Sequence, residues 1–140
     1  MIRDLTDQEV LALTLYGEAR GESIEGQIAV GCVIRNRLTA KEGYKEVCLS
    51  PYQFSCWNSS DPNYPILNGL AEKLTNDEQI TMPIYWQCNF VANDIISGIT
   101  KDVTGGSKNY LTNDLYALGT ITWARYMKVS AVIGSQTFLV

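Results

Sequence analysis

Residues 15–28 read Leu15-Tyr16-Gly17-Glu18-Ala19-Arg20-Gly21-Glu22-Ser23-Ile24-Glu25-Gly26-Gln27-Ile28. A helix is predicted to end within this stretch and a second helix to begin, because Gly21 suits a helix terminus and Ser23 suits an N-cap. Upstream, Leu11, Leu15 and Glu18 are spaced i, i+4 and i+7, so they share one face of the first helix. The stretch therefore predicts a corner between two helices, with a carboxylate at the end of an apolar stripe.

Glu18 is the candidate general acid of this chain. Partial burial disfavours the charged form of a carboxyl group, so we expect the pKa of Glu18 to lie above its ordinary value. A glutamic acid that keeps its proton near neutral pH can donate it to a leaving group. A simpler alternative stays open, in which Glu18 forms a salt bridge with Arg20 or Arg35 at the helix end.

Composition excludes several classes of protein. The 140 residues predict one domain, 1–140, and a hydrophobic fraction of 46% is typical of a water-soluble globular protein. No run approaches the 18 apolar residues of a membrane-spanning helix, so we expect no membrane insertion. The net charge is −4 and the basic residues are scattered, which argues against a nucleic-acid partner.

The chain contains no histidine. This removes Ser-His-Asp and Cys-His nucleophiles in their usual forms, and with them a cysteine amidase based on Cys56. It also removes histidine-ligated zinc, so we expect no metal and no cofactor. Carboxylate acid/base chemistry is the common hydrolytic device that remains.

The four cysteines, at positions 32, 48, 56 and 88, form no Cys-x-x-Cys pair. Cys32 and Cys88 fall in predicted helices and are expected to be small buried hydrophobic residues. A local disulfide between Cys48 and Cys56 stays open.

The charged segment over residues 1–7 is not a secretory signal peptide, so we expect accumulation in the cytoplasm or another export route.

The elements predicted along the chain are mainly helical. A capping box at Thr6 and Glu9 opens the first helix, which runs to about Arg20. The second helix, over about residues 24–38, is apolar around its circumference and is predicted to be the central buried helix. Residues 39–65 show no clean period, so a long loop or small irregular β region is predicted to form one side of a groove.

The second half of the chain is predicted to contain a helix over residues 65–74, a helix over 83–98, a turn over 102–106 and a strand or extended coil over 128–140. The helix over 83–98 is expected to be capped by Thr81 and to end at Gly98. Ile84, Cys88, Val91 and Ile95 form its apolar stripe. We interpret Trp86 and Phe90, on a neighbouring face of this helix, as core residues.

Three separated segments combine the residue types of a binding site: the Glu18 corner, the loop Gln53-Phe54-Ser55-Cys56-Trp57-Asn58, and the turn from Gly105 to Tyr110. Aromatic rings cover the C–H face of a sugar, while amides and hydroxyls bind its polar groups. Together these segments indicate a carbohydrate site. Each aromatic taken alone is better explained by a core position.

The motifs Tyr16-Gly17-Glu18-Ala19-Arg20-Gly21-Glu22, Glu25-Gly26-Gln27-Ile28-Ala29-Val30 and Gln53-Phe54-Ser55-Cys56-Trp57-Asn58 resemble the SleB/CwlJ-type cell wall hydrolases, which include spore-cortex-lytic enzymes and phage lysins. The resemblance implies a lysozyme-like, mainly helical domain. It also implies cleavage of peptidoglycan between N-acetylmuramic acid and N-acetylglucosamine, with Glu18 as the catalytic residue. Catalytic support or substrate contacts are expected from Glu22, Gln53, Phe54, Ser55, Trp57, Asn58, Asn109 and Tyr110.

The later turn departs from the family pattern. Relatives often read Asp-Pro-Thr-Gly-Gly-Ala-Thr-His-Tyr-His, whereas this chain has Asp102-Val103-Thr104-Gly105-Gly106-Ser107-Lys108-Asn109-Tyr110-Leu111. Both histidines are absent, and the tyrosine of the pattern is retained as Tyr110. The departure concerns contacts with the substrate more than the acid itself.

The resemblance also bears on mechanism and on partners. Ordinary glycosidases use two carboxylates, but none of Glu22, Glu25, Asp61, Asp102 and Asp114 stands out as a partner for Glu18. A scheme with one carboxylate fits better, and the resemblance implies that the reaction is that of a lytic transglycosylase. A muramidase-type hydrolase, a non-catalytic peptidoglycan-binding module and an inactive scaffold are the alternatives. The expected partner is the peptidoglycan glycan strand. We expect the protein to be a monomer that accumulates in the cytoplasm and acts at the cell wall, as a phage lysin does.

Overall fold

Helices α1 (Asp7–Ala19) and α2 (Ile24–Asn36) form the predicted corner in the computed structural model, which describes residues 2–140. The capping box is confirmed, because the Thr6 hydroxyl accepts from the Glu9 amide and the Glu9 carboxylate accepts from the Thr6 amide. The Ser23 hydroxyl accepts from the Gly26 amide and caps α2. The corner is thus set by local hydrogen bonds at the start of each helix.

The main core lies between α1, α2 and α5 (Pro83–Ser97). Helix α2 is buried over most of its length, which confirms it as a central helix. Helix α5 ends at Gly98 in the left-handed conformation (φ 78°), as predicted. Its N-cap is Met82, without a side-chain hydrogen bond, so the cap predicted at Thr81 is wrong.

The buried face of α5 differs from the predicted stripe at its start. Tyr85 is 1% exposed and Ile84 is 45% exposed, so the stripe begins one residue later than predicted. Trp86 and Phe90 are exposed, and their interpretation as core residues is wrong. The indole N–H of Trp86 donates to the carbonyl of Ile80, and its ring meets Tyr85 edge to face, so the ring is held at the surface by the segment that precedes α5.

Residues 39–65 are more helical than predicted. They contain α3 (Tyr44–Leu49) and the 3₁₀ turn η2 (Ser55–Trp57), and α4 (Tyr64–Thr75) follows as expected. A further 3₁₀ turn, η1 (Ile2–Asp4), precedes α1. The irregular sheet considered for residues 39–65 is wrong. Helices of one turn carry too few residues to show a 3.6-residue period.

The small β region lies at the other end of the chain. Strands β1 (Asn109–Thr112), β2 (Val129–Ile133) and β3 (Gln136–Leu139) form an antiparallel sheet in the order β1-β3-β2. The tail is therefore strand, one of the two predicted forms. Helices α6 (Asn113–Leu118) and α7 (Thr122–Arg125) connect β1 to β2.

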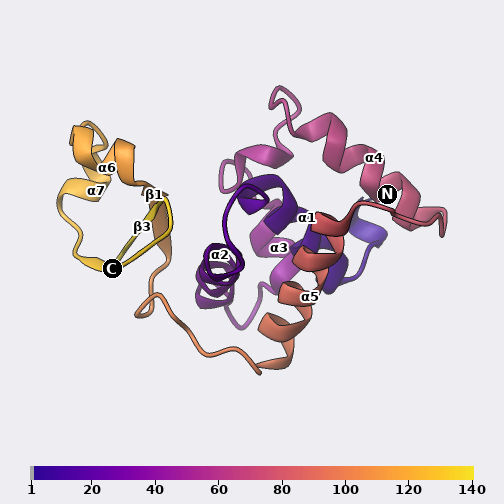
Figure 1. Ribbon diagram of the computed structural model, residues 1–140, viewed down its shortest axis with the longest axis horizontal. Coiled ribbons are helices and arrows are strands. Elements are labelled where there is room, and N and C mark those ends of the chain that lie inside the picture. Colours follow the sequence, from indigo (N-terminus) through magenta and orange to yellow (C-terminus); the bar gives the residue numbers. More distant parts are fainter. Residues whose placement is uncertain (1) are drawn as a thin grey trace.

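The sheet, α6 and α7 lie on one side of the molecule, with the C-terminus, and the larger group of helices lies on the other side, with the N-terminus (Figure 1). One face of the sheet packs on α2, where Phe138 meets Ala29 and Val33. The opposite face buries Leu111 and Leu139. The sheet is thus fixed to α2, the helix that follows the corner carrying Glu18.

The four cysteines are all buried and free, so the local disulfide that the sequence left open does not form. Burial raises the pKa of Cys48 to about 12 and that of Cys88 to about 12, which keeps both thiols protonated. Within residues 2–140, no helix combines the length and the apolar character needed to cross a bilayer.

Candidate active site

Glu18 lies in the last turn of α1 and is partly buried. Burial raises the pKa of its carboxyl group, as predicted, although the backbone amide and thiol of Cys56 lower it in part. Its Oε1 atom is enclosed and accepts no hydrogen bond from any group in residues 2–140. This environment favours a neutral carboxyl group that holds its proton.

The two arginines of the salt-bridge alternative are engaged elsewhere. The Arg20 guanidinium donates to the Tyr16 carbonyl at 3.1 Å and to the Asn63 side chain at 2.6 Å. The Arg35 guanidinium donates to two backbone carbonyls at the end of α5 and just beyond it. The positive charge that acts on Glu18 is that of Arg37, which lowers the pKa of the carboxyl group.

Glu18 opens onto a cleft of about 700 Å³. The cleft is lined by Glu18, Arg37, Tyr52, Gln53, Ser55, Asn109, Tyr110, Leu111, Thr112, Leu115, Trp123 and Gln136. All three segments that the sequence singled out contribute to this lining: the helix corner, the loop at residues 53–58 and the turn that leads into β1. The cleft runs between the helices and the sheet, so both parts of the fold are needed to build it.

Arg37 connects two of these segments. Its Nε atom donates to the Lys108 carbonyl at 2.8 Å, and its Nη1 atom donates to Gln53 Oε1 at 3.1 Å. Its guanidinium carbon lies 5.0 Å from the centre of the Phe54 ring, a cation–π contact. No motif in the sequence singles out this arginine, and only the fold, which brings its charge beside Glu18, identifies it as part of the site.

Tyr110 stacks on Phe138 of the central strand, with ring centres 5.7 Å apart. Burial raises the pKa of the Tyr110 hydroxyl, and the charge of Glu18 raises it further. The hydroxyl therefore keeps its proton and can donate a hydrogen bond into the cleft.

The turn before β1 is held by Asp102. Its carboxylate accepts from the amide and hydroxyl of Thr104 and from the Gly106 amide. Partial burial raises the pKa of Asp102, but these hydrogen bonds and one from Asn36 outweigh it, so the pKa is lowered overall. Asn36 also donates to the Ser107 carbonyl, which ties the turn to α2 and aims β1 at the cleft.

Four predicted contact residues lie outside the cleft lining, and three of them belong to the loop at residues 53–58. Phe54 is 3% exposed and lies beneath Arg37. Trp57 packs against the core, and its indole N–H donates to the Thr14 hydroxyl at 2.9 Å. Asn58 is exposed and closes a turn with the Ser55 carbonyl. The loop therefore presents Gln53 and Ser55 to the cleft and uses its aromatic residues to anchor itself.

Glu22 also lies outside the cleft lining. Both of its carboxylate oxygens are 2.7 Å from the Ser135 hydroxyl, and one also accepts from the Ser135 amide. It joins the helix corner to the turn between β2 and β3.

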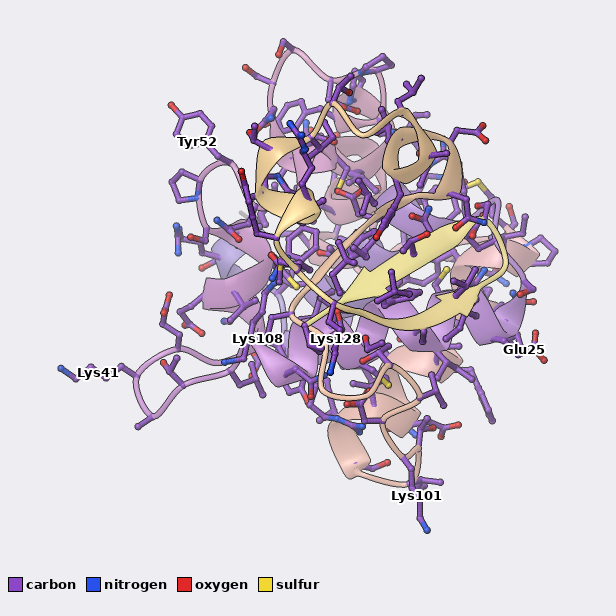
Figure 2. All side chains as sticks on the ribbon, turned by 90° about the vertical axis from the view of Figure 1, so that its left-hand side faces the viewer. Glu25, Lys41, Tyr52, Lys101, Lys108 and Lys128 are labelled. Carbon is purple, nitrogen blue, oxygen red and sulfur yellow. The ribbon has the colours of Figure 1, made fainter. Side chains whose placement is uncertain are left out.

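Two exposed aromatic residues of the cleft were not predicted. Tyr52 projects from the edge of the molecule (Figure 2), with its backbone in the left-handed region at φ 64°. Trp123 of α7 is 47% exposed. Neither belongs to a motif, so only the folded arrangement identifies them. Among residues 2–140, no group of three or more His, Cys, Asp or Glu side chains is placed to hold a metal ion.

Comparison with known proteins gives relatives of one kind. A family model described as cell wall hydrolase matches residues 21–139. The spore cortex-lytic enzyme of Halalkalibacterium halodurans is 30% identical over 125 residues, which cover 85% of this chain and 31% of that protein. The Bacillus subtilis spore cortex-lytic enzyme is 56% identical over 34 residues, 24% of this chain and 11% of that protein. The chain thus spans a third or less of the length of these curated relatives.

Two solved structures share the fold. The catalytic domain of Bacillus cereus SleB has a TM-score of 0.65 and 25% identity, and the match covers 96% of this chain and 89% of that one. The catalytic domain of the germination-specific lytic transglycosylase SleB of Bacillus anthracis has a TM-score of 0.64 and 26% identity, covering 96% and 93%. They confirm the predicted mainly helical, lysozyme-like fold. With the match of the family model over residues 21–139, they show that this chain belongs to the cell wall hydrolase family.

Proposed function

We propose that this chain cleaves the glycan strand of peptidoglycan between N-acetylmuramic acid and N-acetylglucosamine, as a lytic transglycosylase with Glu18 as its acid and base. One observation carries the proposal: Glu18, a carboxyl group with a raised pKa and an enclosed oxygen, lines a large polar cleft in a cell wall hydrolase fold. The names of the relatives, spore cortex-lytic enzymes and a lytic transglycosylase, support the same chemistry.

The reaction needs one carboxyl group in two states. Protonated Glu18 donates its proton to the glycosidic oxygen as the bond from that oxygen to C1 of the muramoyl residue breaks. The resulting carboxylate then removes the proton of the muramoyl C6 hydroxyl, whose oxygen forms a bond to C1. The product is a 1,6-anhydro sugar, Glu18 regains its proton, and no water is consumed.

The surroundings of Glu18 suit both states. Burial favours the neutral acid before the first transfer. The amide and thiol of Cys56, together with the charge of Arg37, favour the carboxylate that forms next. The developing charge is therefore met by groups already in place, which lowers the barrier without rearrangement.

A single carboxylate also fits the composition of the cleft. Glu18 is the one Asp or Glu among the described residues that line it. The charge of Asp61 raises the pKa of Glu18, but Asp61 is absent from the lining and accepts from the Asn63 amide. Retaining and inverting hydrolases place a second carboxylate across the scissile bond, roughly 5–10 Å away. We therefore favour transglycosylation over hydrolysis.

The remaining lining suits a sugar chain. Tyr52 and Trp123 offer exposed aromatic surface for the C–H face of a pyranose, and Gln53, Asn109 and Tyr110 offer polar groups for its hydroxyls. Arg37 adds a positive charge suited to the carboxylate of a lactyl group or peptide stem.

The test compares wild type with Glu18→Gln on purified peptidoglycan. We expect Glu18→Gln to lower the rate of turbidity loss by about 10²- to 10⁴-fold. Glu25→Gln is the matched control, because Glu25 is exposed at the edge of the molecule opposite Tyr52 (Figure 2) and should retain full activity. Lysis by Glu18→Gln at the normal rate would contradict the assignment.

Mass spectrometry of the digest separates the reaction types. A lytic transglycosylase releases muropeptides lighter by one water than those of a hydrolase. Products of the heavier mass would show that the enzyme is a muramidase-type hydrolase and not a lytic transglycosylase. Binding of peptidoglycan by wild type without any cleavage would leave only a binding module.

A further inference from the structure

Gln136 is the first residue of β3, the central strand of the sheet. It pairs with Thr112 of β1, and its side chain shares a face of the sheet with Phe138, the face that packs on α2. Gln136 is 9% exposed and lines the cleft. Its Oε1 atom is enclosed and accepts no hydrogen bond from any group in residues 2–140.

A second buried glutamine, Gln27, differs from Gln136 in that its side-chain oxygen has a hydrogen-bond partner. Gln27 is fully buried, and its side chain is paired at both ends: its Nε2 atom donates to the Glu22 carbonyl, and its Oε1 atom accepts from Gln87. Buried amide groups are generally paired, because an unpaired one forfeits its hydrogen bond to water. Gln136 lacks the partner that Gln27 has.

The enclosed side-chain atoms without a partner in residues 2–140 are Glu18 Oε1 and Gln136 Oε1. Both belong to residues that line the same cleft. Glu18 already has a partner in the proposed reaction, namely the substrate. The location of Gln136 in the same cleft indicates that its partner also arrives with the substrate.

We propose that Gln136 binds the acetamido group of an N-acetylhexosamine residue in the cleft, an inference that rests on the proposed function. As the sugar enters, the terminal amide of Gln136 turns and brings its oxygen out of the enclosed position. The acetamido N–H then donates to that oxygen, and the Gln136 amide nitrogen donates to the acetamido carbonyl. An acetamido group satisfies both ends of the glutamine amide, whereas a hydroxyl group satisfies one at a time. Leu115 and Trp123, in the same lining, supply apolar surface for the acetyl methyl group.

The experiment measures binding in the Glu18→Gln background, where cleavage does not interfere. Its two probes are the β-1,4-linked tetrasaccharide of N-acetylglucosamine and the same tetrasaccharide without acetyl groups. Gln136→Met keeps the volume of the side chain and removes both polar ends. Gln79→Met makes the same change at an exposed position away from the cleft and is the matched control.

Gln136→Met should weaken binding of the acetylated tetrasaccharide roughly 5- to 10-fold and leave binding of the de-acetylated one unchanged. Gln79→Met should change neither affinity. Equal loss for both sugars, no loss for either, or no binding of the acetylated sugar by the parent protein would overturn the inference. Thermal unfolding of Gln136→Met checks that the fold is intact, and a melting temperature at or above that of the parent is expected, because the substitution removes a buried unpaired oxygen.

Failure of the inference and failure of the proposed function give different results. If wild type releases anhydro products while Gln136→Met keeps the affinity of its parent for the acetylated sugar, only the role of Gln136 is wrong. If wild type cleaves nothing while Gln136→Met loses affinity for the acetylated tetrasaccharide alone, the acetamido site stands and the proposed reaction is wrong.

Discussion

At the scale of single residues, partial burial of the Glu18 carboxyl group disfavours its charged form and so lowers the stability of the fold where this group is ionised. The sequence predicted Glu18 and the direction of its pKa shift, because an i, i+4, i+7 stripe is a local pattern. It could not predict Arg37 or Gln136. Arg37 meets Gln53 and Lys108, and Gln136 reaches the cleft only through strand pairing, so both depend on contacts between distant segments.

The pH dependence of activity follows from the raised pKa of Glu18. The first step needs the protonated acid, so kcat/KM should fall as pH rises through this pKa. This fall, the alkaline limb of the pH profile, should lie at a higher pH than the ordinary pKa of glutamate would give. The charge of Asp61 contributes to the rise, so Asp61→Asn should move the limb to lower pH. Asp94→Asn, on α5, should leave it in place. A limb unmoved in Asp61→Asn, measured by turbidity assays across pH, would contradict this account.

Stability should vary with pH for the same reason. The folded protein holds the Glu18 proton to higher pH than the unfolded chain does, so wild type loses stability as pH rises from about 4.5 through the raised folded pKa. Glutamine does not titrate, so Glu18→Gln should gain stability relative to wild type over that window and keep the gain above it. Urea unfolding of both proteins at a series of pH values from about pH 4 upward measures this difference.

At the scale of elements, the sequence predicted well where the signal was long and local. Helices α1, α2, α4 and α5 lie close to their predicted ranges, because each has a cap or an apolar period over several turns. It failed at α3 and η2, which are too short to show a period. It also failed for Trp86, because an aromatic ring on a helix can be buried by a neighbouring segment or, as here, lie along the outside.

The contact between α1 and η2 gives a test at this scale. A Cβ atom at Gly17 would lie 2.7 Å from the Cβ atom of Cys56, so the two elements touch at a position that requires glycine. Gly17→Ala should therefore lower the free energy of unfolding by about 1–3 kcal/mol, despite the better helix propensity of alanine. It should also lower activity, because Cys56 lies beside Glu18.

Gly21→Ala is the control for this test. It lies just after α1, where an added Cβ atom would meet nothing within 4 Å. Its free energy of unfolding should stay within about 0.5 kcal/mol of wild type. Equal effects of the two substitutions would show that the close contact between α1 and η2 is unimportant.

At the scale of the whole molecule, the site depends on how the sheet is held against the helices. The cleft draws Glu18 from α1 and Gln136 from β3, and two of the contacts between the helices and the sheet reach β3 itself or the turn before it. Phe138 packs on α2, and Glu22 binds Ser135 at the turn that leads into β3. The sequence predicted a supporting role for Glu22 near Glu18. In the fold, Glu22 positions the turn that leads into β3 through its hydrogen bonds with Ser135.

A double-mutant cycle with Glu22→Ala and Ser135→Ala tests this contact. Each substitution should lower the free energy of unfolding by about 1 kcal/mol, and the double variant should lose less than the sum, because both remove the same hydrogen bonds. Ser59→Ala, at an exposed loop position, is the control and should be additive with Glu22→Ala. Each single variant of the pair should also lower kcat/KM, because the turn sets the position of Gln136 in the cleft. Strict additivity of Glu22→Ala with Ser135→Ala would mean that the two parts of the fold are held together without this contact, by Phe138 and by the hydrogen bonds of Asn36 and Arg37 to the turn before β1.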